Sequence, residues 1–167
     1  DGSSLTFLFW AKAPTMPDGW SILLGVLNDW DGHVFGVMVD SDGRLEADWQ
    51  SDTGDFAPAA TMITPGAVAL DEWVHIAGVF HPGVGATLYA NGAVVTTYNW
   101  QAGSSAFKVF WTTLLVGSYK WGSGGACIDD LRIYNEVLSQ AQIVTLMNIP
   151  ATSRSGKVKV WDGNDWS

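Results

Sequence analysis

Short runs of apolar and β-branched residues alternate with clusters of turn-forming residues along most of the chain. This pattern predicts strands over residues 20–27, 33–39, 44–49, 73–80, 87–98, 108–117 and 126–134. Strands that follow one another through turns, without helices between them, are typical of antiparallel sandwiches rather than of parallel sheets. The pattern therefore predicts an all-β fold.

Two local signals refine this prediction. Asn91-Gly92 separates two apolar runs, and this pair tolerates the positive φ angles that a two-residue type I′ hairpin requires. Ser139 is followed three residues later by Gln142, which is the spacing of a capping box. We therefore expect a short helix that begins at Ser139 and ends before Pro150.

Three segments carry a resemblance to a known family. They are Leu5–Lys12, the run Trp73-Val-His-Ile-Ala with its continuation Leu88-Tyr-Ala-Asn-Gly, and the run Ile128-Asp-Asp-Leu-Arg-Ile-Tyr with the Leu138-Ser that follows. In order and spacing they resemble laminin-G-like domains of the concanavalin A-like (pentraxin-type) lectin/glucanase superfamily. The resemblance implies an antiparallel jelly-roll sandwich of two sheets, with one short helix after the last core strand. It covers most of residues 1–149, which we take as the domain.

Residues 150–167 form a separate segment. Residues 150–156 have the composition of a polar linker, and residues 157–166 alternate polar and apolar side chains up to an Asp-Gly turn. This C-terminal arm resembles short segments of tailed-phage structural proteins. Because so short a piece is not stable alone, we expect it to add as a β-strand to this sandwich or to a neighbouring chain.

Charge and composition exclude several classes of partner. The formal net charge of −9 disfavours nucleic acid and anionic membrane surfaces. No apolar stretch is long enough to cross a membrane, so we expect no membrane insertion. Cys127, the single cysteine, cannot form an internal disulfide, and its position in a strand predicts a buried apolar thiol.

The acidic residues argue against an enzyme. A retaining glycosidase needs two carboxylates about 5 Å apart. The chain has three glutamates, Glu46, Glu72 and Glu136, and no two of them are close in sequence. We therefore expect no catalytic residues.

A metal site stays open. Asp129 matches the strand position that holds a structural calcium in many members of the resembled superfamily, so the resemblance implies calcium as a possible cofactor. The alternative is that Asp129 caps a turn or pairs with Arg132. Asp40-Ser41-Asp42-Gly43 begins like a calcium loop but has Ser51 where the loop needs Glu, so we interpret it as a hairpin turn.

Tryptophan carries the functional argument, because the chain has 10 of them. Trp10 and Trp73 lie inside strand patterns, and we expect them in the core. Others lie at strand ends beside acidic or small residues, where an indole can stack on a sugar while carboxylates accept its hydroxyl hydrogens. The candidate glycan-binding residues are Trp30, Asp29, Asp31, Trp121, Trp49 and Trp100. Packing under loops or against another subunit is the alternative role for these rings.

Two functions therefore remain open. The first is a non-catalytic recognition or adhesion domain that binds a glycan or surface polysaccharide and is displayed extracellularly or on a virion surface. The second is a purely structural virion decoration or appendage subunit that docks on neighbouring chains. Both readings predict other protein subunits as partners, in an oligomer or a larger assembly.

Overall fold

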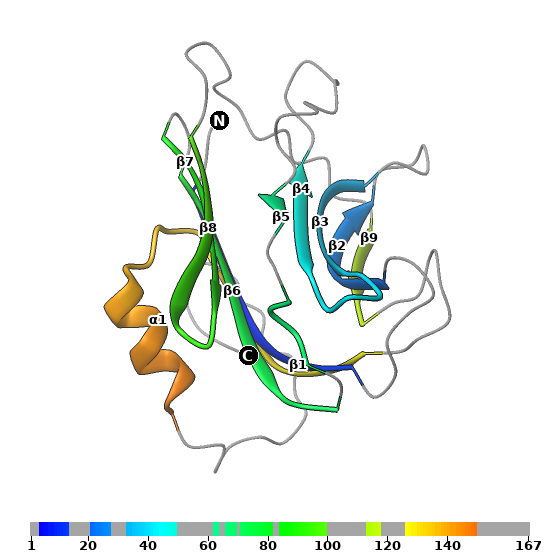
Figure 1. Ribbon diagram of the computed structural model, residues 1–167. Helices are drawn as coiled ribbons and strands as arrows, with labels where there is room; N and C mark the ends of the chain where they lie inside the picture. The colour runs from blue at the N-terminus through cyan, green and yellow to red at the C-terminus, as the bar shows by residue number, and fades with distance from the viewer. Residues whose placement is uncertain are drawn as a thin grey trace.

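Two five-stranded antiparallel sheets face each other in the computed structural model, which describes residues 4–13, 21–27, 33–49, 62–63, 66–69, 71–81, 84–99, 113–117 and 126–149. The first sheet has the order β10 (Cys127–Tyr134), β1 (Leu5–Lys12), β6 (Val74–His81), β7 (Gly85–Ala90), β8 (Ala93–Asn99). The second has the order β5 (Met62–Ile63), β4 (Leu45–Trp49), β3 (His33–Val39), β2 (Ser21–Leu27), β9 (Thr113–Val116). The helix α1 (Gln140–Met147) lies on the side of the first sheet that faces away from the second (Figure 1). The predicted fold class, a two-sheet jelly-roll-like sandwich with one short helix, is confirmed.

The inner faces of the two sheets form the main core. Alternate residues of β1 and β6 point inward and meet the inward residues of β3 and β4, and all of them are nearly inaccessible to solvent. Phe7 lies over Gly78 of β6, where an added Cβ would be only 2.2 Å from Phe7 Cζ. The ring of Phe7 also contacts Phe9 and Phe80, with ring centroids 5.9 Å apart in each pair. A glycine in β6 is thus what makes room for the central aromatic ring.

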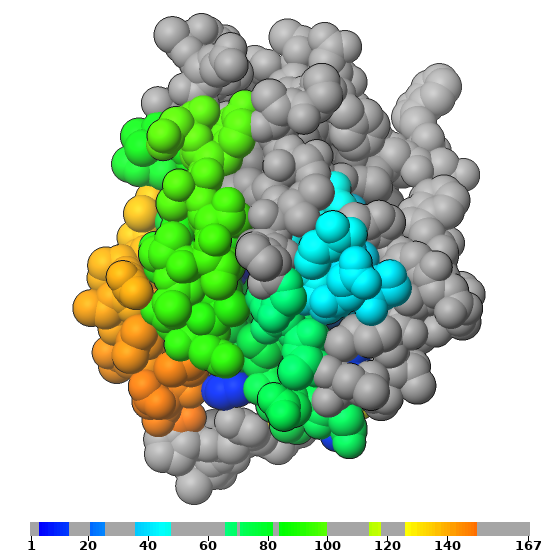
Figure 2. Space-filling view, in the orientation of Figure 1, coloured from blue at the N-terminus to red at the C-terminus, as the bar shows by residue number. Residues whose placement is uncertain are grey.

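The outer face of the first sheet has a second apolar cluster, which α1 covers. Leu8, Ala77, Val79 and Tyr89 pack there against Leu138 and Ile143. The segment that leads into α1 is tied down by Thr6, whose hydroxyl donates to the Glu136 carbonyl and accepts from the Leu138 N–H. Figure 2 shows α1 (orange) against the β7–β8 hairpin (green).

Both local signals in the sequence are confirmed. Asn91 and Gly92 have φ of 49° and 77° and join β7 to β8 in a tight turn. Ser139 caps α1, and its side chain and that of Gln142 complete a capping box. The two-residue strand β5 was not predicted, because two residues are too few to show a period.

The last core strand is not regular. Leu8 pairs with Arg132 and Trp10 with Asp129, so Phe9 alone faces both Asp130 and Leu131. Asp130 has a φ of 54°, the left-handed conformation that such a β-bulge can place in a strand.

Two residues that were expected to be buried are exposed. Trp73 directly precedes β6 and is 47% exposed, so it does not belong to the core. Cys127 is exposed rather than buried. The C-terminal arm lies outside the described residues, so its pairing as a strand stays a prediction. Among the residues that the structure describes, no helix is long and apolar enough to cross a membrane.

Candidate functional site

The outer face of the first sheet continues past α1 into a polar and aromatic region. Leu8 and Ala77 are paired across β1 and β6 under the helix, and the next pair on the same face is Trp10 and His75. The last pair of the two strands is Ala11 and Val74, and Lys12 and Trp73 are the residues next to it on either chain segment. We call the region of Trp10, Lys12, Trp73 and His75 the open half of this face.

His75 is the buried member of the open half. Its side chain is 1% exposed, and neither ring nitrogen has a hydrogen-bond partner within the described part of the chain. The imidazole meets the edge of the Trp10 indole, with ring centroids 5.3 Å apart. Burial lowers the pKa of His75 to about 4, with a raising influence from the Asp130 carboxylate and a lowering one from Arg132. His75 is therefore a packed neutral imidazole at neutral pH.

Asp130 and Arg132 form a two-pronged ion pair on β10. Arg132 Nε and a terminal guanidinium nitrogen donate to the two Asp130 oxygens at 2.9 and 2.8 Å. The two residues are two positions apart on β10, a spacing that brings side chains to the same side of a strand. In the sequence we considered Asp129 as the partner of Arg132, but the structure gives that role to Asp130.

The proposed metal ligand Asp129 lies on β10 opposite Trp10. Within the described ranges, no three His, Cys, Asp or Glu side chains are grouped as a metal site would require. The neighbouring Asp130 carboxylate is taken up by Arg132. Calcium at Asp129 therefore stays a prediction, without support from a gathered set of side-chain ligands.

At the end of the open half, an ion pair joins Lys12 of β1 to Asp71, two residues before the exposed Trp73. Asp71 is in the left-handed conformation with a φ of 57°, and its N–H donates to the Ala13 carbonyl at 2.8 Å. Its carboxylate binds Lys12 Nζ at 2.8 Å. The hydrogen bond and charge of Asp71 raise the pKa of Lys12. Sequence reasoning missed Trp73 as a surface residue, because its apolar strand context favoured the core.

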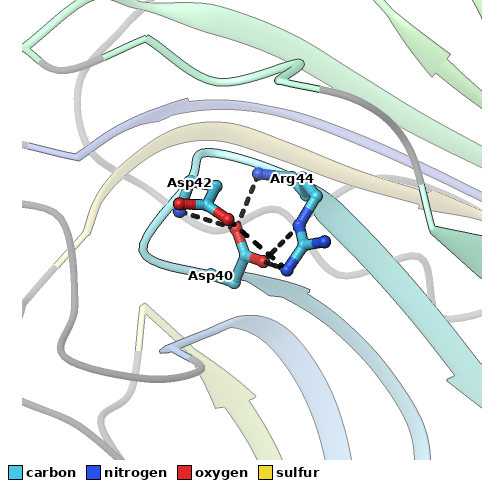
Figure 3. A network of polar contacts seen from close by, with 3 residues as sticks. All are labelled: Asp40, Asp42 and Arg44. Atoms are coloured by element: carbon cyan, nitrogen blue, oxygen red, sulfur yellow. Dashed lines mark hydrogen bonds and ion pairs between the residues drawn. The ribbon is translucent and has the colours of Figure 1, made fainter.

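The Asp40 turn between β3 and β4 is structural, as predicted. Asp40 is buried and accepts hydrogen bonds from the backbone N–H groups of Asp42 and Arg44, both at 2.9 Å, and from the Arg44 guanidinium (Figure 3). Burial raises the pKa of Asp40, but these donors outweigh it and hold the pKa below its usual value. Its carboxylate thus closes the hairpin and is not available as a calcium ligand.

Several predicted glycan-binding residues directly follow or end a strand, and the ends of these strands lie at one end of the sandwich. Leu27 pairs with both His33 and Thr113, and Phe35 pairs with Trp49, so the end of β2, the start of β3 and the end of β4 are together. The β3–β4 and β7–β8 turns lie at the lower end of Figure 1, and β4 and β8 therefore both finish at the upper end. We call this upper end the loop end.

Most of the predicted glycan-binding residues lie outside the described residues. These are Asp29, Trp30 and Asp31 between β2 and β3, Trp100 after β8, and Trp121 between β9 and β10. For Trp49 only the backbone is described, at the end of β4. The chain enters and leaves the segment of Trp121 at the other end of the sheet, because Gly117 donates to the Leu23 carbonyl and lies next to Ala126. The topology thus places the flanks of Trp30, Trp49 and Trp100 at the loop end and those of Trp121 at the opposite end.

The glutamates do not form a catalytic pair in the described part of the fold. Glu46 lies on β4 in the second sheet, Glu72 in the turn before β6, and Glu136 after β10 next to the first sheet. Each belongs to a different element, whereas a glycosidase presents its two carboxylates across one sugar.

Comparison with protein families identifies the fold. Residues 1–144 match the model of the concanavalin A-like lectin/glucanases superfamily in its laminin-G form. The chain therefore belongs to this superfamily. A sequence search of curated proteins finds no match.

Solved structures with the same fold include binding domains. The CBM40 of the IT-sialidase of Ruminococcus gnavus is 20% identical, with a TM-score of 0.71 over 86% of this chain and 82% of that one. A second structure of that domain, bound to alpha2,3 sialyllactose, is 19% identical, with a TM-score of 0.70 over the same shares. The receptor binding domain of botulinum neurotoxin D is 13% identical, with a TM-score of 0.68 over 87% of this chain and 37% of that one.

Proposed function

We propose that this member of the concanavalin A-like superfamily is a non-catalytic domain that recognises glycans or surface polysaccharides. It acts in adhesion or recognition, outside cells or on the surface of a virion. The family and the fold support this proposal, because one similar structure holds a sialylated sugar and another is a toxin's receptor binding domain. The scattered glutamates support a binding role without catalysis.

The observation that carries the proposal is the gathering of strand ends at the loop end. The end of β2 before Trp30 and the end of β4 at Trp49 lie together there, and β8, which Trp100 follows, finishes at the same end of the sandwich (Figure 1). Asp29 and Asp31 flank Trp30 in the sequence. Indoles stack on the apolar C–H face of a sugar, and carboxylates accept its hydroxyl hydrogens. The sequence thus supplies both kinds of group in or next to segments whose described strand ends lie at the loop end (Figure 1).

The experiment is retention of the protein on immobilised glycans, with sialyllactose among them. We expect Trp30→Ala to weaken retention by about 1–3 kcal/mol, the order expected when an aromatic stacking partner is lost. Val94→Ala, another exposed apolar residue, lies on β8 near the β7–β8 turn and away from the loop end, so it serves as the control and should bind like the unmodified protein. Trp121→Ala reports whether the opposite end binds independently.

The proposal fails if Trp30→Ala, Trp49→Ala and Trp100→Ala all bind like the unmodified protein. It also fails if the unmodified protein is retained by none of the glycans. Melting temperatures of the variants separate lost binding from lost folding.

The second candidate function is a structural virion subunit, and exposed apolar residues on β9 favour it. Leu114 and Val116 are 42% and 40% exposed on the last described strand of the second sheet. Exposed apolar side chains on an edge strand favour association with another chain. We expect a multimer in a measurement of native mass, with Leu114→Lys shifting it toward monomer. A monomer at all concentrations would remove this candidate.

A further inference from the structure

We propose that the open half of the outer face of the first sheet is a second glycan-binding surface, centred on Trp73 and suited to a neutral pyranose unit. The inference goes beyond the proposed loop-end site, which uses other residues at the other end of the sandwich. It rests on an exposed aromatic residue, on an ion pair that involves a residue two positions before it, and on the paired strands from which both extend.

Trp73 supplies the flat apolar surface. Its indole is 47% exposed, although it directly precedes the fully buried start of β6. An exposed indole at the end of a buried strand offers a hexose a stacking surface, and a tryptophan side chain has only two χ angles to order. The strand itself is anchored, because the N–H of Asn91 donates to the His75 carbonyl at 2.7 Å and the Asn91 side chain accepts from the His75 N–H at 3.0 Å.

Lys12 and Asp71 supply the polar groups. Their 2.8 Å ion pair holds one donor and one acceptor together, at Lys12 directly after the last β1–β6 pair and at Asp71 two residues before Trp73. The left-handed backbone of Asp71 and its hydrogen bond to the Ala13 carbonyl hold the carboxylate in place. A carboxylate and an ammonium at neighbouring positions are matched to adjacent hydroxyls of one sugar ring.

The charges select a neutral sugar. Lys12 is already neutralised by Asp71, and Arg132 by Asp130. A sugar carboxylate would find no uncompensated cation among the described residues of the open half, in a chain of formal net charge −9. Hydroxyls have no such charge penalty.

The two sites lie at opposite ends of the first sheet. The start of β6 lies beside the β7–β8 turn, at the lower end of Figure 1, whereas β8 finishes at the loop end. Substitutions at one site therefore do not touch the other.

Native gels that contain mannan, galactomannan, xylan or polygalacturonate test the inference through the retardation of the whole chain. We expect Trp73→Ala to weaken retardation by a neutral polysaccharide about tenfold, and Asp71→Asn to weaken it less. Asn tolerates a positive φ, so Asp71→Asn keeps the turn while it removes the charge. Val94→Ala is the matched control, because Val94 is also 47% exposed and lies on β8 of the same sheet.

Each outcome decides the inference. Weaker retardation of Trp73→Ala alongside an unchanged Val94→Ala supports it, provided that both variants melt like the unmodified protein. Equal retardation of Trp73→Ala and the unmodified protein in all gels overturns it, as does Trp73-dependent retardation by polygalacturonate alone. Retardation of the unmodified protein by no neutral polysaccharide also overturns it, and retention on sialyllactose then decides the loop-end site separately.

Discussion

The outer face of the first sheet has two halves that differ in what covers them. Under α1 the strands present Leu8, Ala77 and Val79, and the helix buries them. One residue pair further along β1 and β6, the same face presents Trp10 and His75, and after them Lys12 and the exposed Trp73. The strands and their alternation are the same in both halves.

The alternation of residues along a strand predicts on which side of the sheet a side chain lies. It does not predict whether another element packs on that side. Sequence alternation cannot reveal where a short helix ends on a sheet, because that depends on contacts between residues far apart in the chain. In this molecule the Thr6 hydroxyl fixes the position of α1, through residues more than a hundred positions away. In the half beyond the helix, His75 is still buried, and the exposed indole of Trp73 lies at the far end of that half.

The contrast between the two halves is tested most directly by a substitution in the half that α1 covers. Ile143 is fully buried between α1 and the sheet. We expect Ile143→Ala to lower the free energy of unfolding by about 2–5 kcal/mol, because it leaves a cavity in a packed cluster. Chemical denaturation measures this loss, and Trp73→Ala in the open half should cost less than about 1 kcal/mol.

Thr145→Ala is the control on the same helix, because Thr145 is exposed. If Ile143→Ala loses no more stability than Thr145→Ala, the packing of Ile143 on Leu8 and Ala77 contributes little, because Ala is a better helix former than either residue. The contrast between the two halves would then not be one of packing.

Much of the fold follows from local sequence signals. The Asn91-Gly92 turn, the Ser139 cap and the Asp40 turn each depend on residues within four positions of one another, and all three are confirmed. The sandwich itself was predicted from alternating strands and from the resemblance. The bulge at Asp130 was not predicted, because an extra residue in one strand is visible only against its partner β1.

The candidate sites were harder to predict. Trp73 looked like a core residue, because a strand pattern does not show where the buried part of a strand begins. Cys127 was expected to be buried for the same reason, although β10 is the last described strand of its sheet and Cys127 is its first residue. The signal that could have found Trp73 is the preceding Asp71-Glu72 pair, two charged residues that mark the surface.

The smaller test concerns the boundary between the two halves, where His75 lies. The pKa of His75 is about 4 in the folded protein, against an ordinary value of 6.5. The folded state therefore binds this proton less readily than the unfolded state does. The neutral, buried imidazole therefore favours the folded state fully above about pH 6.5. As the pH falls toward 4, the free energy of unfolding decreases by roughly 3 kcal/mol at most, because only the unfolded state takes up the proton readily.

His75→Leu removes the titrating group and keeps an apolar side chain of similar size beside Trp10. We expect the difference in unfolding free energy between this variant and the unmodified protein to shift in favour of the variant as the pH falls from about 6.5 to 4. Denaturation at a series of pH values measures it, and His81→Leu is the control, because His81 is exposed at the other end of β6. Asp130 and Arg132 face His75 from β10, so Asp130→Asn should lower the pKa of His75 further and steepen the dependence. If the difference in unfolding free energy between His75→Leu and the unmodified protein does not change with pH, the pKa of His75 is not lowered by burial. His75 would then be in contact with water, and the solvent-exposed part of this face would begin at His75.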